Sequence, residues 1–297
     1  MRTIVSAAAV FIAVLIAAPG TQSQTGVTNA PAGFDLNGNG FVEEFCANQG
    51  ALTDSPNSPE IPDGRNDPED ECERDAAIEE FTGPEGVADG LGPIFNAAGC
   101  GKCHIVPVLG GGSQIMERRA GLVQNGVFTD HPGGSLIQDR ALPTHLKFQE
   151  LVDNNKTNVV AFRASIPLQG IGFVEMLSNT TLQNFAKNQS SSQRGQITNV
   201  PVLEKPGQNR IGRFGWKGQQ ASLVSFSADA YVNEMGITSP LQPTENTSNG
   251  IVVSDPVPGL DDEGVDVELF ALFMRDLKAP PRGFIRQRRE GRRTSVQ

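Results

Sequence analysis

Apolar residues recur at helical spacing in several separate stretches of this chain, whereas the strict alternation typical of half-buried strands is scarce. The clearest stretch is residues 265–277, an amphipathic helix whose apolar stripe contains Val265, Leu269, Leu272 and Phe273, with Leu277 below. Shorter helices are predicted elsewhere, over residues 72–82, 175–177, 182–186 and 219–236. The pattern therefore predicts a mainly α protein with long irregular loops.

The loops are predicted from turn-forming residues, since the chain contains 33 Gly and 20 Pro among its 297 residues. Residues 24–90 are expected to form an irregular N-terminal segment, and residues 241–264 read as a linker rich in Pro, Asn, Ser and Gly.

The first 23 residues predict an export signal. A positive start at Arg2 is followed by an apolar run over residues 7–18, and polar residues come next. The run is shorter than the roughly 20 residues that span a bilayer, so we expect cleavage and no stable membrane span. An uncleaved membrane anchor is the alternative. The predicted location is the periplasm or the exterior of the cell.

The excess of acidic over basic residues excludes some classes of binding partner. The formal net charge is −10, which argues against binding to nucleic acid or to anionic membrane surfaces.

Cys100, Cys103 and His104 form a Cys-x-x-Cys-His motif, the attachment signature of haem c. Two thiols at this spacing can form thioether bonds to a haem, and the adjacent imidazole can then bind the iron from one face. We therefore predict one haem c per chain, with His104 as the axial ligand. Leu91, Ile94 and Phe95 have helical spacing upstream and are expected to pack at the haem edge.

Two further features lie in the N-terminal segment. Cys46 and Cys72 are an even pair in an exported protein, which favours a disulfide over two free thiols. Residues 35–46 resemble an EF-hand loop, but Cys46 stands where the loop requires Glu, so a Ca²⁺ site competes with a plain Asn/Gly turn.

Several stretches in the same order resemble the di-haem oxidoreductase family, also called thiol oxidoreductases. The family is related to bacterial di-haem cytochrome c peroxidases and to MauG-type enzymes. The stretches that carry the resemblance are residues 89–96, 100–104, 133–140, 170–175, 212–217, 225–240, 273–275 and 279–282. The resemblance implies a helical, cytochrome c-like haem domain over residues 91–282, with a redox partner protein or a small oxidant such as peroxide as its reactant.

The resemblance and the residue types together suggest roles around the haem. Met235 is the first candidate for a distal iron ligand, and an open distal site is the alternative. Glu175 is the candidate proton carrier if peroxide reacts there. Trp216 is predicted to assist electron transfer, as a Trp does between the haems of relatives. Arg140 and Arg213 are candidates to pair with the haem propionates.

The chain departs from the family pattern at its C-terminal end. Relatives continue into a second domain with its own Cys-x-x-Cys-His, but no cysteine follows Cys103 here. Residues 283–297 form a basic tail, which we expect to be disordered and to reflect a truncation or a frameshift; a genuine mono-haem variant is the alternative.

Three functions follow from these observations. The leading hypothesis is the first-haem part of a di-haem peroxidase-type oxidoreductase, whose absent second haem leaves enzymatic activity open. The second is a mono-haem electron carrier without catalysis. The third is a haem-free module in which Cys100 and Cys103 form a disulfide or bind a metal ion.

Overall fold

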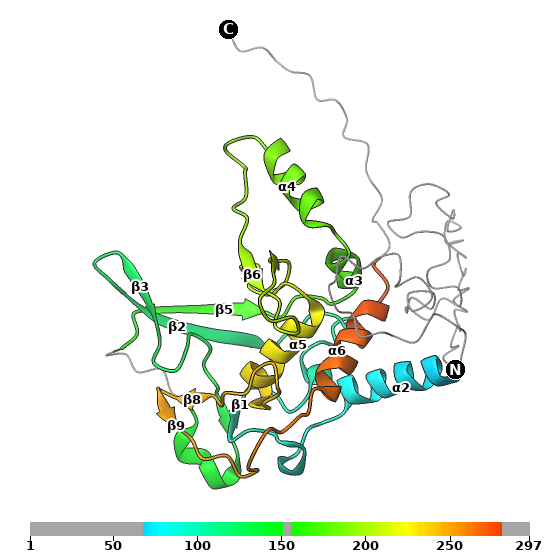
Figure 1. Cartoon of the computed structure of the whole chain (residues 1–297). Helices are drawn as coiled ribbons and strands as arrows, with labels where there is room; N and C mark the ends of the chain where they lie inside the picture. The colour runs from blue at the N-terminus through cyan, green and yellow to red at the C-terminus, as the bar shows by residue number, and fades with distance from the viewer. Residues whose placement is uncertain (1–67, 151–155, 281–297) are drawn as a thin grey trace, which may run out of the picture.

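The computed structural model describes residues 68–150 and 156–280 (Figure 1). Four predictions lie outside the described residues: the signal peptide over 1–23, the Ca²⁺ loop over 35–46, the disulfide from Cys46 to Cys72, and the tail over 283–297.

Three helices build the main core: α2 (Pro68–Thr82), α5 (Leu223–Ala230) and α6 (Val265–Asp276). The ring of Phe81 from α2 stacks on Phe273 of α6, with 3.8 Å between centroids. Tyr231, just after α5, packs edge-on against Phe270. The helices predicted over 72–82 and 265–277 are thus confirmed, and α2 packs into the same core as the later helices.

The buried face of α6 differs from the predicted stripe. Within that stripe Leu272, Phe273 and Leu277 are buried, but Val265 is exposed. Val267, Phe270, Ala271 and Met274, which the stripe omitted, are buried as well. Phe270 and Ala271 lie three and four positions after Val267, and Met274 lies four and three positions after them, so the four side chains share one helix face. Because α2 and α5 both pack against α6, its second half is buried on nearly every side.

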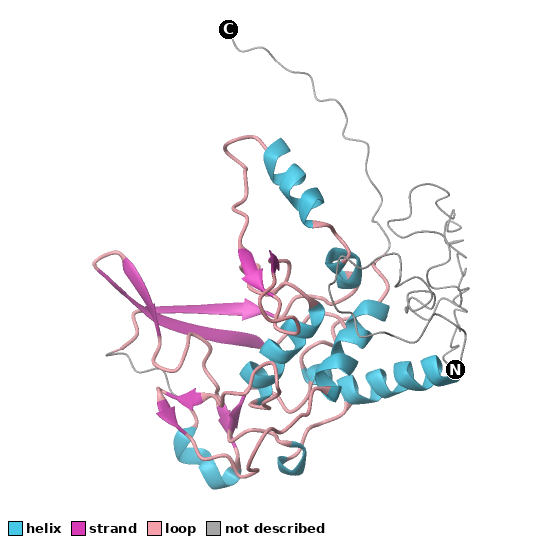
Figure 2. Cartoon of the chain, in the orientation of Figure 1, coloured by secondary structure: helices cyan, strands magenta, loops and turns pink. Residues whose placement is uncertain are grey.

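The prediction of a mainly α protein is wrong. The structure is mixed, with 30% helix, 20% strand and several small antiparallel sheets (Figure 2). The largest sheet has the order β3-β2-β5, formed by Val127–Asp130, Met116–Gln124 and Val159–Ala164. It projects from the helical body in Figure 1. A two-residue turn, Asn125–Gly126, with positive φ at both residues, joins β2 to β3 as tight hairpins require.

The other elements are short. The strands pair as β1–β4 (Ile94–Phe95 with Arg140–Ala141), β6–β7 (Asn199–Pro201 with Asn209–Ile211) and β8–β9 (Thr247–Ser248 with Ile251–Val252). The short helical turns are η2 (Val87–Asp89), η3 (Cys100–Lys102), η4 (Pro143–Phe148) and α3 (Ile171–Glu175). α4 (Asn179–Asn188) begins at Ser178, whose hydroxyl accepts the Thr181 N–H. Ile94 and Phe95, for which the sequence spacing indicated a helix, lie in strand β1.

The helix predicted over 219–236 forms in two parts. Ser222 caps α5, because its hydroxyl accepts the N–H of Ser225. α5 then continues as η5, a π-helical turn over Tyr231–Met235, which Gly236 ends with φ of 71°. A Cβ on Gly92 would lie 2.5 Å from the Gly236 carbonyl oxygen, so the glycine lets the β1 segment approach this turn closely. In the part of the chain that the structure describes, no helix is both long and apolar enough to span a membrane.

Candidate functional site

The turn η3 gathers the residues of the Cys-x-x-Cys-His motif. The N–H groups of Cys103 and His104 both donate to the Cys100 carbonyl, at 3.1 and 3.0 Å. Gly99 precedes the turn with φ of 144°, and a Cβ there would lie 2.4 Å from the Gly83 carbonyl oxygen. Only glycine fits this junction, and the turn brings both thiols and the imidazole to the wall of one cavity.

The orientation of His104 gives its two ring nitrogens different roles. Nδ1 lies 3.1 Å from the Gly111 carbonyl oxygen, which can only accept a hydrogen bond, so this nitrogen carries the proton. Burial lowers the pKa of His104, which keeps the ring neutral near pH 7. The lone pair then resides on Nε2, and a carbonyl that holds Nδ1 is the usual arrangement of metal-binding histidines.

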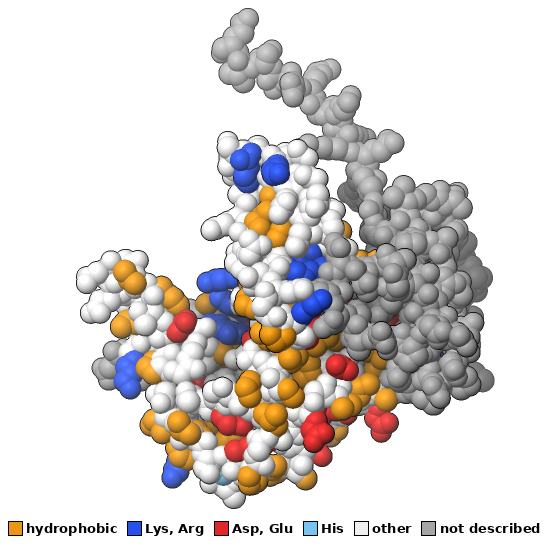
Figure 3. All heavy atoms as spheres, in the orientation of Figure 1, with side chains coloured by type: hydrophobic (Ala, Val, Ile, Leu, Met, Phe, Trp, Pro, Cys, Tyr) orange, Lys and Arg blue, Asp and Glu red, His pale blue; other side chains and the backbone are white. Residues whose placement is uncertain are grey.

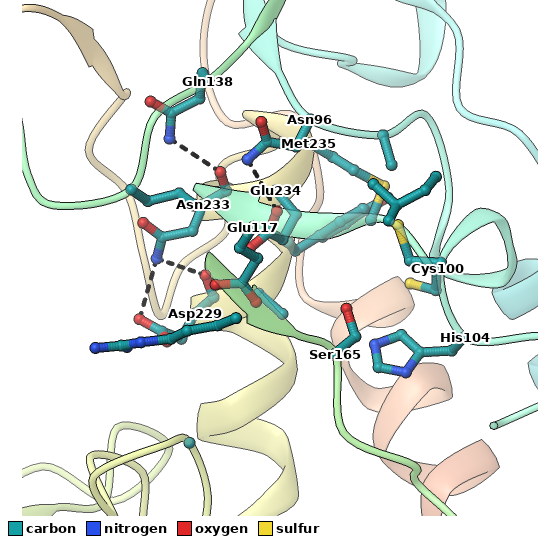
Figure 4. Close-up of a pocket in the computed structure, with 18 of the residues that line it drawn as sticks. Asn96, Cys100, His104, Glu117, Gln138, Ser165, Asp229, Asn233, Glu234 and Met235 are labelled. Atoms are coloured by element: carbon teal, nitrogen blue, oxygen red, sulfur yellow. Dashed lines mark hydrogen bonds between the residues drawn. The ribbon is translucent and has the colours of Figure 1, made fainter. Parts of the chain in front are cut away.

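Cys100 and Cys103 are free thiols beside this imidazole, and Figure 4 shows Cys100 and His104 at the same wall of the cavity. Burial raises the pKa of both thiols, and nearby carboxylates add to the effect, Glu85 at Cys100 and Glu234 at Cys103. Both thiols are therefore protonated at neutral pH.

The cavity has a volume of about 380 Å³, within the range of sites that hold small molecules and cofactors. Its walls combine apolar side chains with several arginines and carboxylates. The apolar part comes from the core helices and from the segment after β2–β3, with Phe81, Leu136, Ile137, Phe270 and Met274.

The π-helical turn η5 forms another wall and presents Glu234 and Met235 to the cavity. A π-helical turn inserts an extra residue into a helix and is frequent at functional sites. Met235 is buried and lines the cavity, which is where a distal ligand would have to lie. Its ligation of iron stays a prediction.

Glu234 is the carboxylate with the most distinctive environment in the cavity (Figure 4). Its Oε2 accepts a hydrogen bond from Asn96 Nδ2 at 3.0 Å. Burial, followed by the nearby negative charge of Glu117, raises the pKa of Glu234 to about 7. A cleft carboxylate with a pKa near neutrality can both accept and donate a proton.

Glu117 and Arg119 reach the cavity from β2. Residues two apart on a strand point to the same face, so both side chains leave β2 on the cavity side. Arg119 donates from Nε and Nη2 to Glu117 Oε2, at 2.9 and 2.6 Å. Since Arg119 neutralises Glu117, Glu234 is the better candidate for proton transfer.

The structure brings two further predicted residues to the cavity. Arg140 lies on β4 and lines the cavity, where its charge partly offsets the rise that burial causes in the pKa of Cys103. Trp216 is 53% exposed at the edge of the cavity, with the guanidinium carbon of Arg163 5.9 Å from its ring centroid.

Glu175 and Arg213 do not line the cavity. The Glu175 carboxylate is buried and forms a bidentate ion pair with Arg275, with Nε to Oε2 at 2.8 Å. It also accepts the N–H of Leu223 at 2.7 Å. Arg213 donates to the carbonyls of Ile211 and Leu177. Both residues thus join elements of the fold, and the structure does not bring them to the cavity with Cys100, Cys103 and His104.

Sequence reasoning missed several cavity residues: Asn96, Glu117, Arg119, Asp229 and Glu234. The one available signal was the position of Glu234 beside Met235, in a stretch that carries the family resemblance.

A second acidic group lies behind the cavity, on the side of Tyr231. The Tyr231 hydroxyl lies 3.1 Å from Glu85 Oε1 and 3.3 Å from Asp266 Oδ2. Burial and then the charge of Glu80 raise the pKa of Glu85 to about 7, and burial followed by Asp266 raises that of Glu80. Folding therefore brings the carboxylates of Glu80, Glu85 and Asp266 close together, whereas in the unfolded chain they are far apart.

We expect the free energy of unfolding to fall as the pH rises from about 4.5 to about 7. In this window the folded Glu85 keeps a proton that the unfolded chain releases. The contribution is on the order of 1 kcal/mol, because solvent screens these half-buried groups. Glu85→Gln should reduce the fall, measured by urea unfolding at pH 5 and pH 8. Glu79→Gln on the exposed side of α2 is the control, and an equal fall in both variants would refute the assignment.

The donor set fits a covalently attached haem. The two thiols and the imidazole of His104 line one cavity, apolar walls suit the porphyrin, and Arg140 can pair with a propionate. No family model, curated protein or solved structure matches this chain.

Proposed function

We propose that this chain is an exported haem c protein of the di-haem peroxidase type, which transfers electrons and reduces peroxide when a reductant is supplied. One observation carries the proposal: Cys100, Cys103 and His104 meet at a cavity large enough for a cofactor, with Nδ1 of His104 held by the Gly111 carbonyl. Export is supported by the predicted signal peptide, since haem is attached to c-type cytochromes outside the cytoplasm.

The bound haem would supply an iron that accepts and donates single electrons. His104 would hold that iron from one side, with the Gly111 carbonyl fixing the ring. The two thioether bonds would hold the macrocycle against the apolar wall, so that it stays in place in either redox state.

Glu234 replaces Glu175 as the proposed proton carrier. Its carboxylate can take a proton from one oxygen of hydrogen peroxide and return it to the departing oxygen. Reduction of one peroxide to two waters consumes two electrons and two protons in all. Asn96 orients the Glu234 carboxylate for this transfer through the 3.0 Å hydrogen bond.

A mono-haem electron carrier is the second candidate, and the position of Met235 favours it. Met235 lies in the cavity wall, and a thioether bound to iron would close the site to peroxide. A Met235→Ala variant separates the two functions, because only a ligated iron changes its visible spectrum and potential when the sulfur is removed.

We expect one covalent haem per chain when the protein is produced with a haem-attachment system. The pyridine haemochrome spectrum of the denatured polypeptide measures it. Cys100→Ala/Cys103→Ala should abolish covalent haem, because no thiol is left to form a thioether bond.

The matched control is Cys46→Ser/Cys72→Ser, which removes the same number of thiols outside the motif and should keep the haem. If the unaltered protein carries no haem absorbance on its polypeptide band, the peroxidase and the electron carrier both fail. The haem-free module would then be the remaining function.

A further inference from the structure

The charge of the chain is unevenly distributed. Residues 156–217 contain eight Lys and Arg and only two Glu, although the whole chain has 24 Lys and Arg against 34 Asp and Glu. One stretch is therefore strongly basic within an acidic protein, and such a field steers oppositely charged partners.

Two of these eight cations lie on an arm that projects from the body, formed by α4 and the segment returning to β6 (Figure 1). The base of the arm is held by Asn179, whose Oδ1 accepts the Ile211 N–H at 3.3 Å, and by Arg213, which donates to the Leu177 carbonyl. Lys187 and Arg194 are exposed on the arm, and neither is ion-paired with a carboxylate of the described residues.

A groove of about 300 Å³ lies beneath α4. Leu182, Phe185 and Ile197 contribute apolar surface, and Phe185 is 68% exposed. Figure 3 shows this apolar surface on the arm next to Lys and Arg side chains. Apolar surface surrounded by charges of one sign is typical of a protein interface.

The groove and the candidate haem cavity meet at two consecutive residues. Lys217 lines the groove, and Trp216 lines the cavity while remaining half exposed. A protein seated in the groove would therefore lie next to the cavity opening. Arg163, beside the Trp216 ring, adds positive charge at this point.

We propose that the α4 arm and its groove are the docking surface for an acidic electron-donor protein, which delivers single electrons to the site beside Trp216. This inference rests on the proposed function. Two donor molecules, each oxidised by one electron, would supply the two electrons that reduce one peroxide. The charge of the arm selects an acidic donor.

The test uses the full-length protein with two reduced probes, an acidic [2Fe–2S] ferredoxin and a basic mitochondrial-type cytochrome c. Biolayer interferometry at low ionic strength should show binding of the ferredoxin and none of the cytochrome. Lys187→Glu should weaken ferredoxin binding at least fivefold, and Lys187→Glu/Arg194→Glu at least tenfold. Lys147→Glu changes the same charge on η4, away from the arm, and should change binding less than twofold.

A second measurement locates the contact. A carbodiimide joins carboxylates of the ferredoxin to lysines they touch, so mass spectrometry should find links at Lys187 and Lys217. Phe185→Ala should weaken binding, whereas Phe128→Ala, an exposed Phe on β3, should not.

Links at Lys147 in place of the arm would overturn the proposal. So would equal binding of both probes, linked homodimers without the ferredoxin, or sedimentation with anionic phospholipid vesicles that Lys187→Glu abolishes. The outcome is independent of haem content: a haem-free protein that binds ferredoxin refutes the proposed function alone, and a haem-loaded protein that does not bind it refutes the docking surface alone.

Discussion

Replacing Glu234 by Gln should lower the second-order rate constant for reaction with hydrogen peroxide by about 10²–10⁴-fold, the usual loss when a positioned acid–base group is removed. The amide has nearly the shape of the carboxylate but cannot take the peroxide proton. Stopped-flow absorbance of the haem-loaded protein measures this rate constant without a need for turnover.

The pH dependence of the same reaction gives a sharper test. Glu234 must be deprotonated to act as a base, and its pKa is about 7. The rate constant should rise with pH and level off above about pH 7, whereas Glu234→Gln should show no such rise. Glu234→Asp should retain part of the activity, and Glu79→Gln on the surface of α2 should retain all of it. An unchanged rate for Glu234→Gln would rule out this residue as the proton carrier.

Replacing Arg275 by Met should destabilise the protein by about 3–5 kcal/mol, because it leaves the Glu175 carboxylate buried without its partner. The side chains of Arg275 and Glu175 are only 2% and 6% exposed, so water cannot compensate. The loss is measured as the change in the free energy of urea unfolding.

The double variant Glu175→Gln/Arg275→Met is the control. It removes both charges, and the amide oxygen introduced by Glu175→Gln can still accept the Leu223 N–H, which the carboxylate accepts at 2.7 Å. We expect it to recover most of the lost stability. A loss below about 1 kcal/mol in the single variant would show that the ion pair contributes little.

These two experiments also separate the roles of Glu175 and Glu234. Local sequence does not distinguish the two residues, since each is a glutamate next to a methionine. The structure places Glu175 between α3 and α6 with its charge neutralised, and Glu234 in the cavity with an altered pKa.

The sequence by itself determined the local features. The Cys-x-x-Cys-His spacing is a short-range covalent pattern, and the structure folds it into the turn that joins the thiols and the imidazole. Helices over 72–82 and 265–277 were predictable from local sequence. Helical hydrogen bonds join residues four positions apart, so the residues that decide whether a helix forms are close neighbours in the chain.

The sheet was missed for a physical reason. A half-buried strand is recognised by apolar residues at every second position, on the side that faces inward. On β2 the inward positions near the cavity hold the charged residues Glu117 and Arg119, so this alternation is absent. The Asn125–Gly126 turn was the local signal that predicts a hairpin there.

The environments of the two carboxylates were decided by the tertiary structure alone. Asn96 and Glu234 are 138 positions apart, and Glu175 and Arg275 are 100 positions apart. Burial and charge pairing set the chemistry of a carboxyl group, and both depend on neighbours that only folding brings together. The sequence shows that a glutamate is present, but its neighbours in the folded protein set its pKa and therefore whether it can exchange a proton near neutral pH.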